Sequence, residues 1–108
     1  MQLNEFQNEC MRTAIYPVSN ALEYTALGLV SEAGEVAGKV KKIIRDDGGR
    51  LTPETREALI MEYIDTAWYV AEGLRALDCT FEGAAQKLLN KLEKRSREGK
   101  IGGSGDYR

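Results

Sequence analysis

The sequence predicts an all-α protein, a bundle of about four helices. Apolar residues recur at steps of three and four along most of the chain, and no segment shows convincing period-two alternation. Gly, Pro and Thr mark the joints between these segments. With 108 residues the chain is long enough for one core and too short for two. We therefore expect a single domain over residues 1–108, with a glycine-rich tail from about residue 99.

The first two helices are predicted from apolar spacing and from the residues that end it. Residues 3–15 carry apolar or small side chains near helical spacing, and Pro17 closes this segment. The second helix starts at Asn20, which is a suitable N-cap. Its apolar residues form a stripe along one face, and the helix should end near Gly48 and Gly49.

Two further helices are predicted in the second half of the chain. Thr52 followed by Pro53 is a typical helix start, and this helix should run to about Leu77. Thr80 is a good N-cap for the fourth helix, whose apolar side begins at Phe81. The segment after it is rich in glycine and has no periodicity, so we expect loop or extended chain there.

Composition excludes several classes of function. The net charge of -2 gives no overall attraction to nucleic acid or to a membrane, and no segment approaches the roughly 18 apolar residues of a spanning helix. The N-terminal stretch lacks the pattern of a signal peptide, so we expect a cytoplasmic protein with no membrane or nucleic-acid partner. Cys10 and Cys79 are expected to be reduced and buried. The absence of histidine removes Ser/His/Asp triads and the HExxH zinc site, which leaves carboxylates, lysines and metals for any chemistry.

Three glycines lie inside the second predicted helix. Gly28, Gly34 and Gly38 each cost about 1 kcal/mol relative to alanine in a helix interior. A single glycine inside a helix can be tolerated without any structural role. Three within eleven residues predict that another helix or a ligand closely approaches the backbone there.

Two acidic pairs lie on the two longest predicted helices. Glu32 and Glu35 are three residues apart on the second helix, and Glu62 and Asp65 have the same spacing on the third. Either pair alone is a common feature of a solvated helix face. Two such pairs in a chain without histidine predict that four carboxylates point into one pocket between packed helices. An all-oxygen site of this kind suits Mg²⁺ or Mn²⁺.

The stretches GLVSEAGEVAGKVKK, EYIDTAWYVAEGL and KLEKRSREGKIGGSGDYR, taken together, resemble the MazG-like family of the all-α NTP pyrophosphatase superfamily. The opening EFQNECMRTAIYP is similar to that family's N-terminal helix. The resemblance implies a Mg²⁺-dependent hydrolase that cleaves nucleoside triphosphates between the α- and β-phosphates, giving a monophosphate and pyrophosphate. It also implies dimers or tetramers. The metal-binding acids of the family map onto Glu32, Glu35, Glu62 and Asp65.

Hydrolysis at phosphorus needs a positioned water and charge compensation on the phosphate oxygens, which divalent ions can supply. Glu35 or Glu32 would then accept the proton of the water. Four basic residues are candidates for phosphate contacts, with complementation of the helix dipole as the alternative for those near a helix end. They are Lys39, Lys42, Lys91 and Arg95.

A nucleobase pocket should be apolar or aromatic with a few polar groups. Trp68 is the best candidate because it follows Asp65 by three residues and lies off the centre of the apolar stripe, while Tyr16, Tyr24 and Phe6 are further candidates. Core packing is the alternative for each of these aromatic side chains. The family-like N-terminus adds Gln7 and Arg12 as polar contacts.

Self-association is predicted as well, because the third helix is apolar or aromatic nearly all round from Ile64 to Ala71. The alternative to an enzyme is a non-catalytic helical module that oligomerises or binds a partner, with acids that are merely solvated.

Overall fold

The computed structural model describes residues 1–106, and these residues form four α-helices and no strand. The prediction of an all-α fold is therefore confirmed. The helices are α1 (Leu3–Met11), α2 (Ala21–Asp47), α3 (Pro53–Ala76) and α4 (Phe81–Arg97), and a short 3₁₀ turn, η1 (Val18–Asn20), precedes α2.

Local capping interactions set most of the helix ends. The Thr52 hydroxyl accepts a hydrogen bond from the Thr55 N–H at 3.1 Å, and the Thr52 N–H donates to the Thr55 hydroxyl at 2.8 Å, which makes a capping box. The Thr80 hydroxyl accepts from the Gly83 N–H at 3.0 Å. Gly48 ends α2 in the left-handed conformation with φ 61°. Asn20 occupies the predicted N-cap position of α2 but makes no side-chain capping bond.

Helix α1 is shorter than predicted, because it ends at Met11 and not near residue 15. At the end of α1 the N–H groups of residues 12–14 bond to carbonyls three residues earlier, as in tight turns. The Thr13 hydroxyl also donates to the Cys10 carbonyl at 3.0 Å. The following residues leave the helix axis and carry Tyr16 to the side of α3, where its hydroxyl is hydrogen-bonded. Tertiary contacts thus override the helical pattern of this segment.

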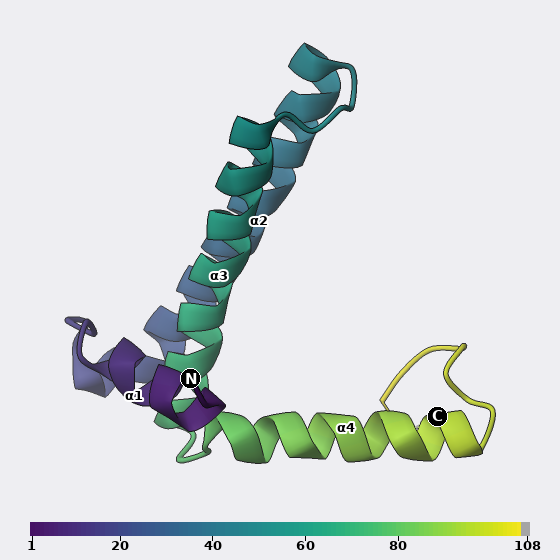
Figure 1. Ribbon diagram of the computed structural model, residues 1–108. Helices are drawn as coiled ribbons and strands as arrows, with labels where there is room; N and C mark the ends of the chain where they lie inside the picture. Colours follow the sequence, from purple (N-terminus) through teal and green to yellow (C-terminus); the bar gives the residue numbers. More distant parts are fainter. Residues whose placement is uncertain (107–108) are drawn as a thin grey trace.

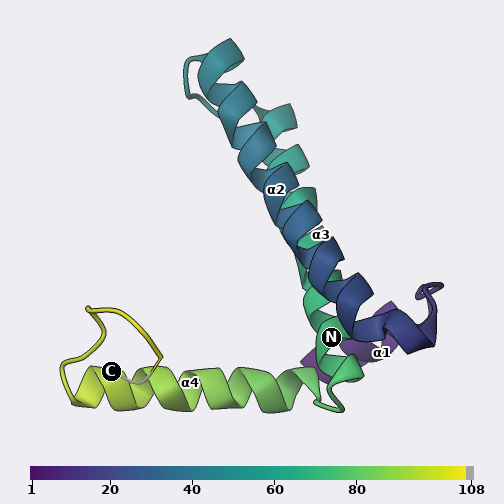
Figure 2. The same cartoon turned by 180° about the vertical axis from the view of Figure 1, so that it is seen from behind.

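Helices α2 and α3 lie side by side along their length as an antiparallel hairpin (Figure 1). Helix α1 packs across the base of this hairpin, and α4 starts from the same end and runs away from it, as Figure 2 also shows. The chain extends over 43 × 41 × 27 Å and its radius of gyration is 16.8 Å. A compact domain of this length has a radius of gyration of about 13 Å, so the single chain is open.

Few large side chains are buried within the single chain. The buried apolar residues in the part of the chain that is described are Cys10, Ile43 and Ala71. Both cysteines are free thiols, and Cys79 is only half-buried. None of the helices in residues 1–106 combines the length and the apolar character needed to cross a bilayer.

One flank of the hairpin carries a continuous row of apolar side chains from both helices, which we call the hairpin apolar face. Many of them are exposed, including Ile44 at 65% and Tyr63 at 64%. A hollow of about 250 Å³ lies in this face, between Leu22, Leu29, Tyr69 and Leu74. By helical spacing the face comprises Leu22, Ala26, Leu29, Val36, Val40 and Ile44 of α2 and Leu59, Ile60, Tyr63, Val70, Leu74 and Leu77 of α3.

Gly28 of α2 makes room for the ring of Tyr69 on α3. A Cβ atom at Gly28 would collide with the ring of Tyr69, so only glycine leaves room for this ring against α2. The prediction of a close approach is confirmed at this position. At Gly34 and Gly38, nothing within residues 1–106 lies within 4 Å of an added Cβ.

Candidate metal and nucleotide site

Three carboxylates from the two hairpin helices meet near the middle of α2 and α3. Glu32, Glu62 and Asp65 each offer an oxygen, and these oxygens lie within 4.8 Å of one another. Glu32 and Glu62 are half-buried and Asp65 is exposed. The structure therefore brings together three of the four acids that were predicted to bind metal. We call Glu32, Glu62 and Asp65 the acidic cluster.

Glu35 is exposed and lies outside the acidic cluster. It follows Glu32 by three residues, which turns its side chain by about 60° around the α2 axis. Its charge still acts on Glu32. Glu35 is thus a neighbour of the cluster, and the expected set of four convergent carboxylates is reduced to three.

The electrostatics of the acidic cluster are unfavourable without a cation. Burial raises the pKa of Glu32 above its ordinary value, and the negative charges of Asp65, Glu62 and Glu35 raise it further. Lys39 offers partial compensation, because its Nζ lies 3.5 Å from Glu62 Oε1. The set of hard oxygen donors fits Mg²⁺ or Mn²⁺ by its chemistry.

A pocket of about 390 Å³ opens beside the acidic cluster, and Glu32 and Asp65 form part of its wall. Pockets that bind small ligands measure about 300–1,000 Å³, so its size is suitable. The rest of the wall is mostly aromatic and consists of Tyr16, Tyr24, Trp68 and Tyr69, with Thr13 and Ile15. We call it the aromatic pocket.

The aromatic rings of this pocket pack on one another. Tyr16 and Tyr24 stack with ring centroids 4.9 Å apart, and Trp68 meets Tyr69 edge to face at the same centroid distance. Trp68, Tyr16 and Tyr24 were predicted from the sequence as candidates for this role, and Tyr69 was missed. Tyr69 follows Asp65 by one helical turn, and this spacing is the signal that would have identified it. Phe6 instead packs against another aromatic ring outside the pocket.

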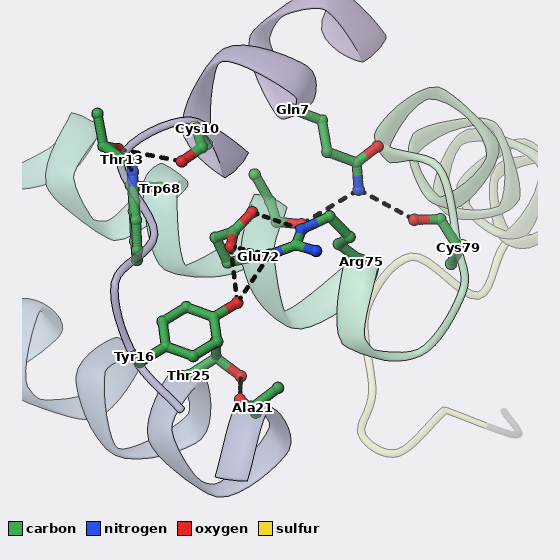
Figure 3. A network of polar contacts seen from close by, with 11 residues as sticks. Gln7, Cys10, Thr13, Tyr16, Ala21, Thr25, Trp68, Glu72, Arg75 and Cys79 are labelled. Carbon is green, nitrogen blue, oxygen red and sulfur yellow. Dashed lines mark hydrogen bonds and ion pairs between the residues drawn. The ribbon is translucent and has the colours of Figure 1, made fainter. Parts of the chain in front are cut away.

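Tyr16 connects the aromatic pocket to a polar network centred on Glu72, which is fully buried (Figure 3). Its carboxylate accepts hydrogen bonds from the Tyr16 hydroxyl at 2.6 Å and from Arg75 Nη2 and Nε at 2.6 and 3.0 Å. Burial by itself would raise the pKa of Glu72, but the hydrogen bonds from Arg75 and Tyr16 outweigh it and hold this pKa below its ordinary value. Sequence reasoning missed this residue, which lies one turn beyond Trp68.

Gln7 was expected to contact a nucleobase, and the structure places it elsewhere. Its Nε2 donates to the Ala71 and Cys79 carbonyls at 3.1 and 3.0 Å (Figure 3). Its Oε1 accepts from the Phe81 N–H at 3.0 Å. Gln7 therefore holds α1, α3 and α4 together, and both of its amide N–H donors are used within the protein. Arg12 is exposed and pairs with Glu9 at 3.0 Å, beside the pocket residue Thr13.

Of the four basic residues expected at phosphate, Lys39 is the one that pairs with the acidic cluster among the described residues. Lys42 is exposed in a later turn of α2. Lys91 and Arg95 lie on α4, which runs away from the hairpin, and both bind Asp106 Oδ1, at 3.2 and 3.3 Å. Within one chain the structure does not bring these two residues to the acidic cluster.

Comparison with known proteins identifies a phage relative. The chain is 44% identical to the Gene 37 protein of Mycobacterium phage L5, over an alignment of 114 positions that covers all of both chains. No protein-family model matches the chain, and no solved structure matches it significantly.

Proposed function

The chain belongs to the family of the Gene 37 protein of Mycobacterium phage L5, and we propose that it is a Mg²⁺-dependent nucleoside triphosphate pyrophosphohydrolase of the MazG-like type. The observation that carries this proposal is the acidic cluster beside the aromatic pocket. Carboxylates alone are common on surfaces. Three that converge from two helices, next to a pocket lined by four aromatic rings, form an arrangement that suits a metal-bound phosphate and an attached base.

In this proposal Glu32, Glu62 and Asp65 hold Mg²⁺ or Mn²⁺. When bound, the ion supplies charge neutralisation on the phosphate oxygens and lowers the pKa of a coordinated water. Glu35 lies next to the acidic cluster and outside it, so we propose that Glu35 accepts the proton of the attacking water. Lys39, which pairs with Glu62, would exchange this contact for a phosphate oxygen.

We further propose that the protein is a homodimer or homotetramer in which a second copy covers the hairpin apolar face. The single chain exposes 8027 Å² of surface. A compact monomer of 12.0 kDa exposes about 6,000 Å², so each chain carries an excess of about 2,000 Å². This excess is of the size that obligate dimers bury. Lys91 and Arg95 would then reach phosphate only in a site of another copy, because α4 directs them away from their own.

The test is pyrophosphate release from a panel of deoxynucleoside triphosphates with Mg²⁺. We expect activity from the unaltered protein, and a loss of at least about 100-fold in Glu32→Gln and Asp65→Asn, because each removes a metal ligand. Glu35→Gln should lower kcat more than it raises KM. The matched control is Glu57→Gln, an exposed acid of α3 outside the acidic cluster, which should retain full activity.

Metal binding is measured separately by thermal unfolding. At a Mn²⁺ concentration about 100 times its Kd, the ion should stabilise the folded protein by about 2.7 kcal/mol, and Asp65→Asn should remove this effect. A protein that cleaves no nucleotide and whose midpoint does not respond to Mn²⁺ would instead be the helical oligomerisation or partner-binding module.

A further inference from the structure

Apart from the carboxylates of Glu32 and Asp65, which the proposed function assigns to the metal, three polar side chains in the wall of the aromatic pocket are bonded to the protein itself. The Tyr16 hydroxyl donates to Glu72 at 2.6 Å and the indole N–H of Trp68 donates to the Thr13 hydroxyl at 2.9 Å. That hydroxyl in turn donates to the Cys10 carbonyl at 3.0 Å. These three side chains therefore present rings and methyl groups to a ligand, and their donors are already used.

The position of Tyr16 depends on Glu72. Tyr16 lies in the irregular segment between α1 and η1, so no helix holds it. Its hydroxyl is hydrogen-bonded to the Glu72 carboxylate and to Arg75 (Figure 3). Glu72 is rigidly placed on α3, is fully buried, and is clamped by two hydrogen bonds from Arg75. It thus fixes one end of the Tyr16 ring, while stacking on Tyr24 fixes the face.

We propose that the aromatic pocket binds a nucleobase by ring contacts without reading the hydrogen-bonding edge of the base, and that Glu72 is the positioning residue that holds Tyr16 in the wall. This inference rests on the proposed function, since it takes the pocket to be the base half of a nucleotide site. A site with free donors and acceptors can discriminate substrates by 10⁴-fold or more, whereas apolar contacts discriminate by about 10–200-fold. Stacking on aromatic rings tolerates every base. The substrate class is therefore nucleoside triphosphates with little base preference.

Binding is measured with the four uncharged 2′-deoxynucleosides in EDTA, so that neither the metal nor phosphate repulsion contributes. Trp68 is the single tryptophan of the chain and lines the pocket, so its fluorescence reports occupancy. We expect the four Kd values to fall within about tenfold of one another. A Kd for one base that is more than about 200-fold lower than the others would overturn the inference, because ring contacts alone do not discriminate so strongly.

Variants of the wall test the positioning role. Tyr16→Leu removes the ring and should weaken the binding of all four nucleosides by about tenfold or more. Tyr16→Phe and Glu72→Ala keep the ring but release its anchor, and should weaken all four by the same few-fold factor without changing their order. Glu72→Gln should restore affinity, because an amide oxygen still accepts the Tyr16 hydrogen bond.

The matched control is Tyr63→Leu, since Tyr63 lies on the hairpin apolar face and not in the pocket. It should bind all four nucleosides like the unaltered protein. The inference fails if Tyr63→Leu weakens binding as much as Tyr16→Leu, or if Tyr16→Phe changes the affinity for one base alone. Circular dichroism confirms that each variant retains its helices, and Tyr16→Phe covers the case in which Glu72→Ala does not fold.

The two proposals fail in different ways. Nucleoside binding with equal affinities but no pyrophosphate release would contradict the hydrolase and support the stacking pocket. Hydrolysis restricted to one base would support the hydrolase and contradict the unselective pocket. A folded protein that binds none of the nucleosides contradicts the pocket whatever its activity.

Discussion

At the scale of single residues, Glu72 shows how its partners keep a buried carboxylate charged. Its folded-state pKa lies below the ordinary value of 4.5, because the hydrogen bonds from Arg75 and Tyr16 outweigh the effect of burial. A carboxyl with a lowered folded pKa stabilises the protein fully above its unfolded pKa, and this contribution is lost as the pH falls through the folded value. The pH dependence of stability should therefore contain a component that belongs to Glu72.

The variant Glu72→Gln should reveal that component. At neutral pH we expect its free energy of unfolding to be lower by about 1.5–3 kcal/mol, the value of hydrogen bonds to a charged group. Below the ordinary pKa of 4.5 the difference should shrink, since Glu72 becomes protonated in the unaltered protein too. Urea unfolding at neutral pH and near pH 3 measures both differences. If the two proteins differ by the same free energy of unfolding at both pH values, the assignment of this pH dependence to Glu72 is wrong. The control is Glu98→Gln, because Glu98 forms an exposed pair with Lys100, and it should change the free energy of unfolding by less than about 1 kcal/mol.

At the scale of elements, the helix ends could be predicted wherever their cause is local. Thr52 with Pro53, Thr80 and Gly48 act through neighbouring backbone groups, and each marks a helix end in the structure. The end of α1 could not be predicted in this way, because Tyr16 is drawn toward a partner 56 residues further along the chain.

In the candidate site, too, the features with a local cause could be predicted and those that depend on tertiary contacts could not. The acidic cluster was accessible to sequence reasoning because helical spacing places Glu62 and Asp65 on one side of α3. The structural role of Gln7 was not, since it depends on how α1 meets α3 and α4. The direction of α4 is set by the short turn after α3, where Asp78 adopts φ 55°, and no periodicity in the helices specifies that turn.

Alanine substitutions in α2 test the packing between the hairpin helices. Gly28→Ala should lower the free energy of unfolding by about 1–3 kcal/mol, because the new methyl group collides with the Tyr69 ring. Gly34→Ala and Gly38→Ala are matched controls in open space, and each should stabilise the helix by up to about 1 kcal/mol. Thermal unfolding of the three variants makes the comparison. Destabilisation by Gly34→Ala would mean that another chain approaches α2 at that position.

At the scale of the whole molecule, the open shape and the exposed hairpin apolar face support the proposed self-association. A radius of gyration of 16.8 Å and an exposed area of 8027 Å² are both too large for a self-contained domain of this length. Burial of three apolar residues within the described part of the chain supplies little of the stabilisation that a folded domain needs.

We therefore expect light scattering at micromolar concentration to give a mass that is a multiple of 12.0 kDa. Ile60→Glu places a charge in the hairpin apolar face and should dissociate the oligomer or prevent folding, because the charge would be buried without a partner. Val18→Glu, at a residue that is 87% exposed outside this face, should leave the mass unchanged. A folded monomer of the unaltered chain would show that the apolar face remains uncovered.

Tyr69 lines both the aromatic pocket and the hollow in the hairpin apolar face. One side chain thus forms a partition between the place where a ligand would sit and the surface where another subunit would pack, and the absence of a side chain at Gly28 leaves the room that its ring occupies. If a bound ligand or a packed subunit shifts this ring, ligand binding in the pocket changes the affinity of the apolar face for the other subunit. Thermodynamic reciprocity then requires subunit packing to change the ligand affinity by the same free energy. Assembly and ligand binding would then be linked functions of a single aromatic ring.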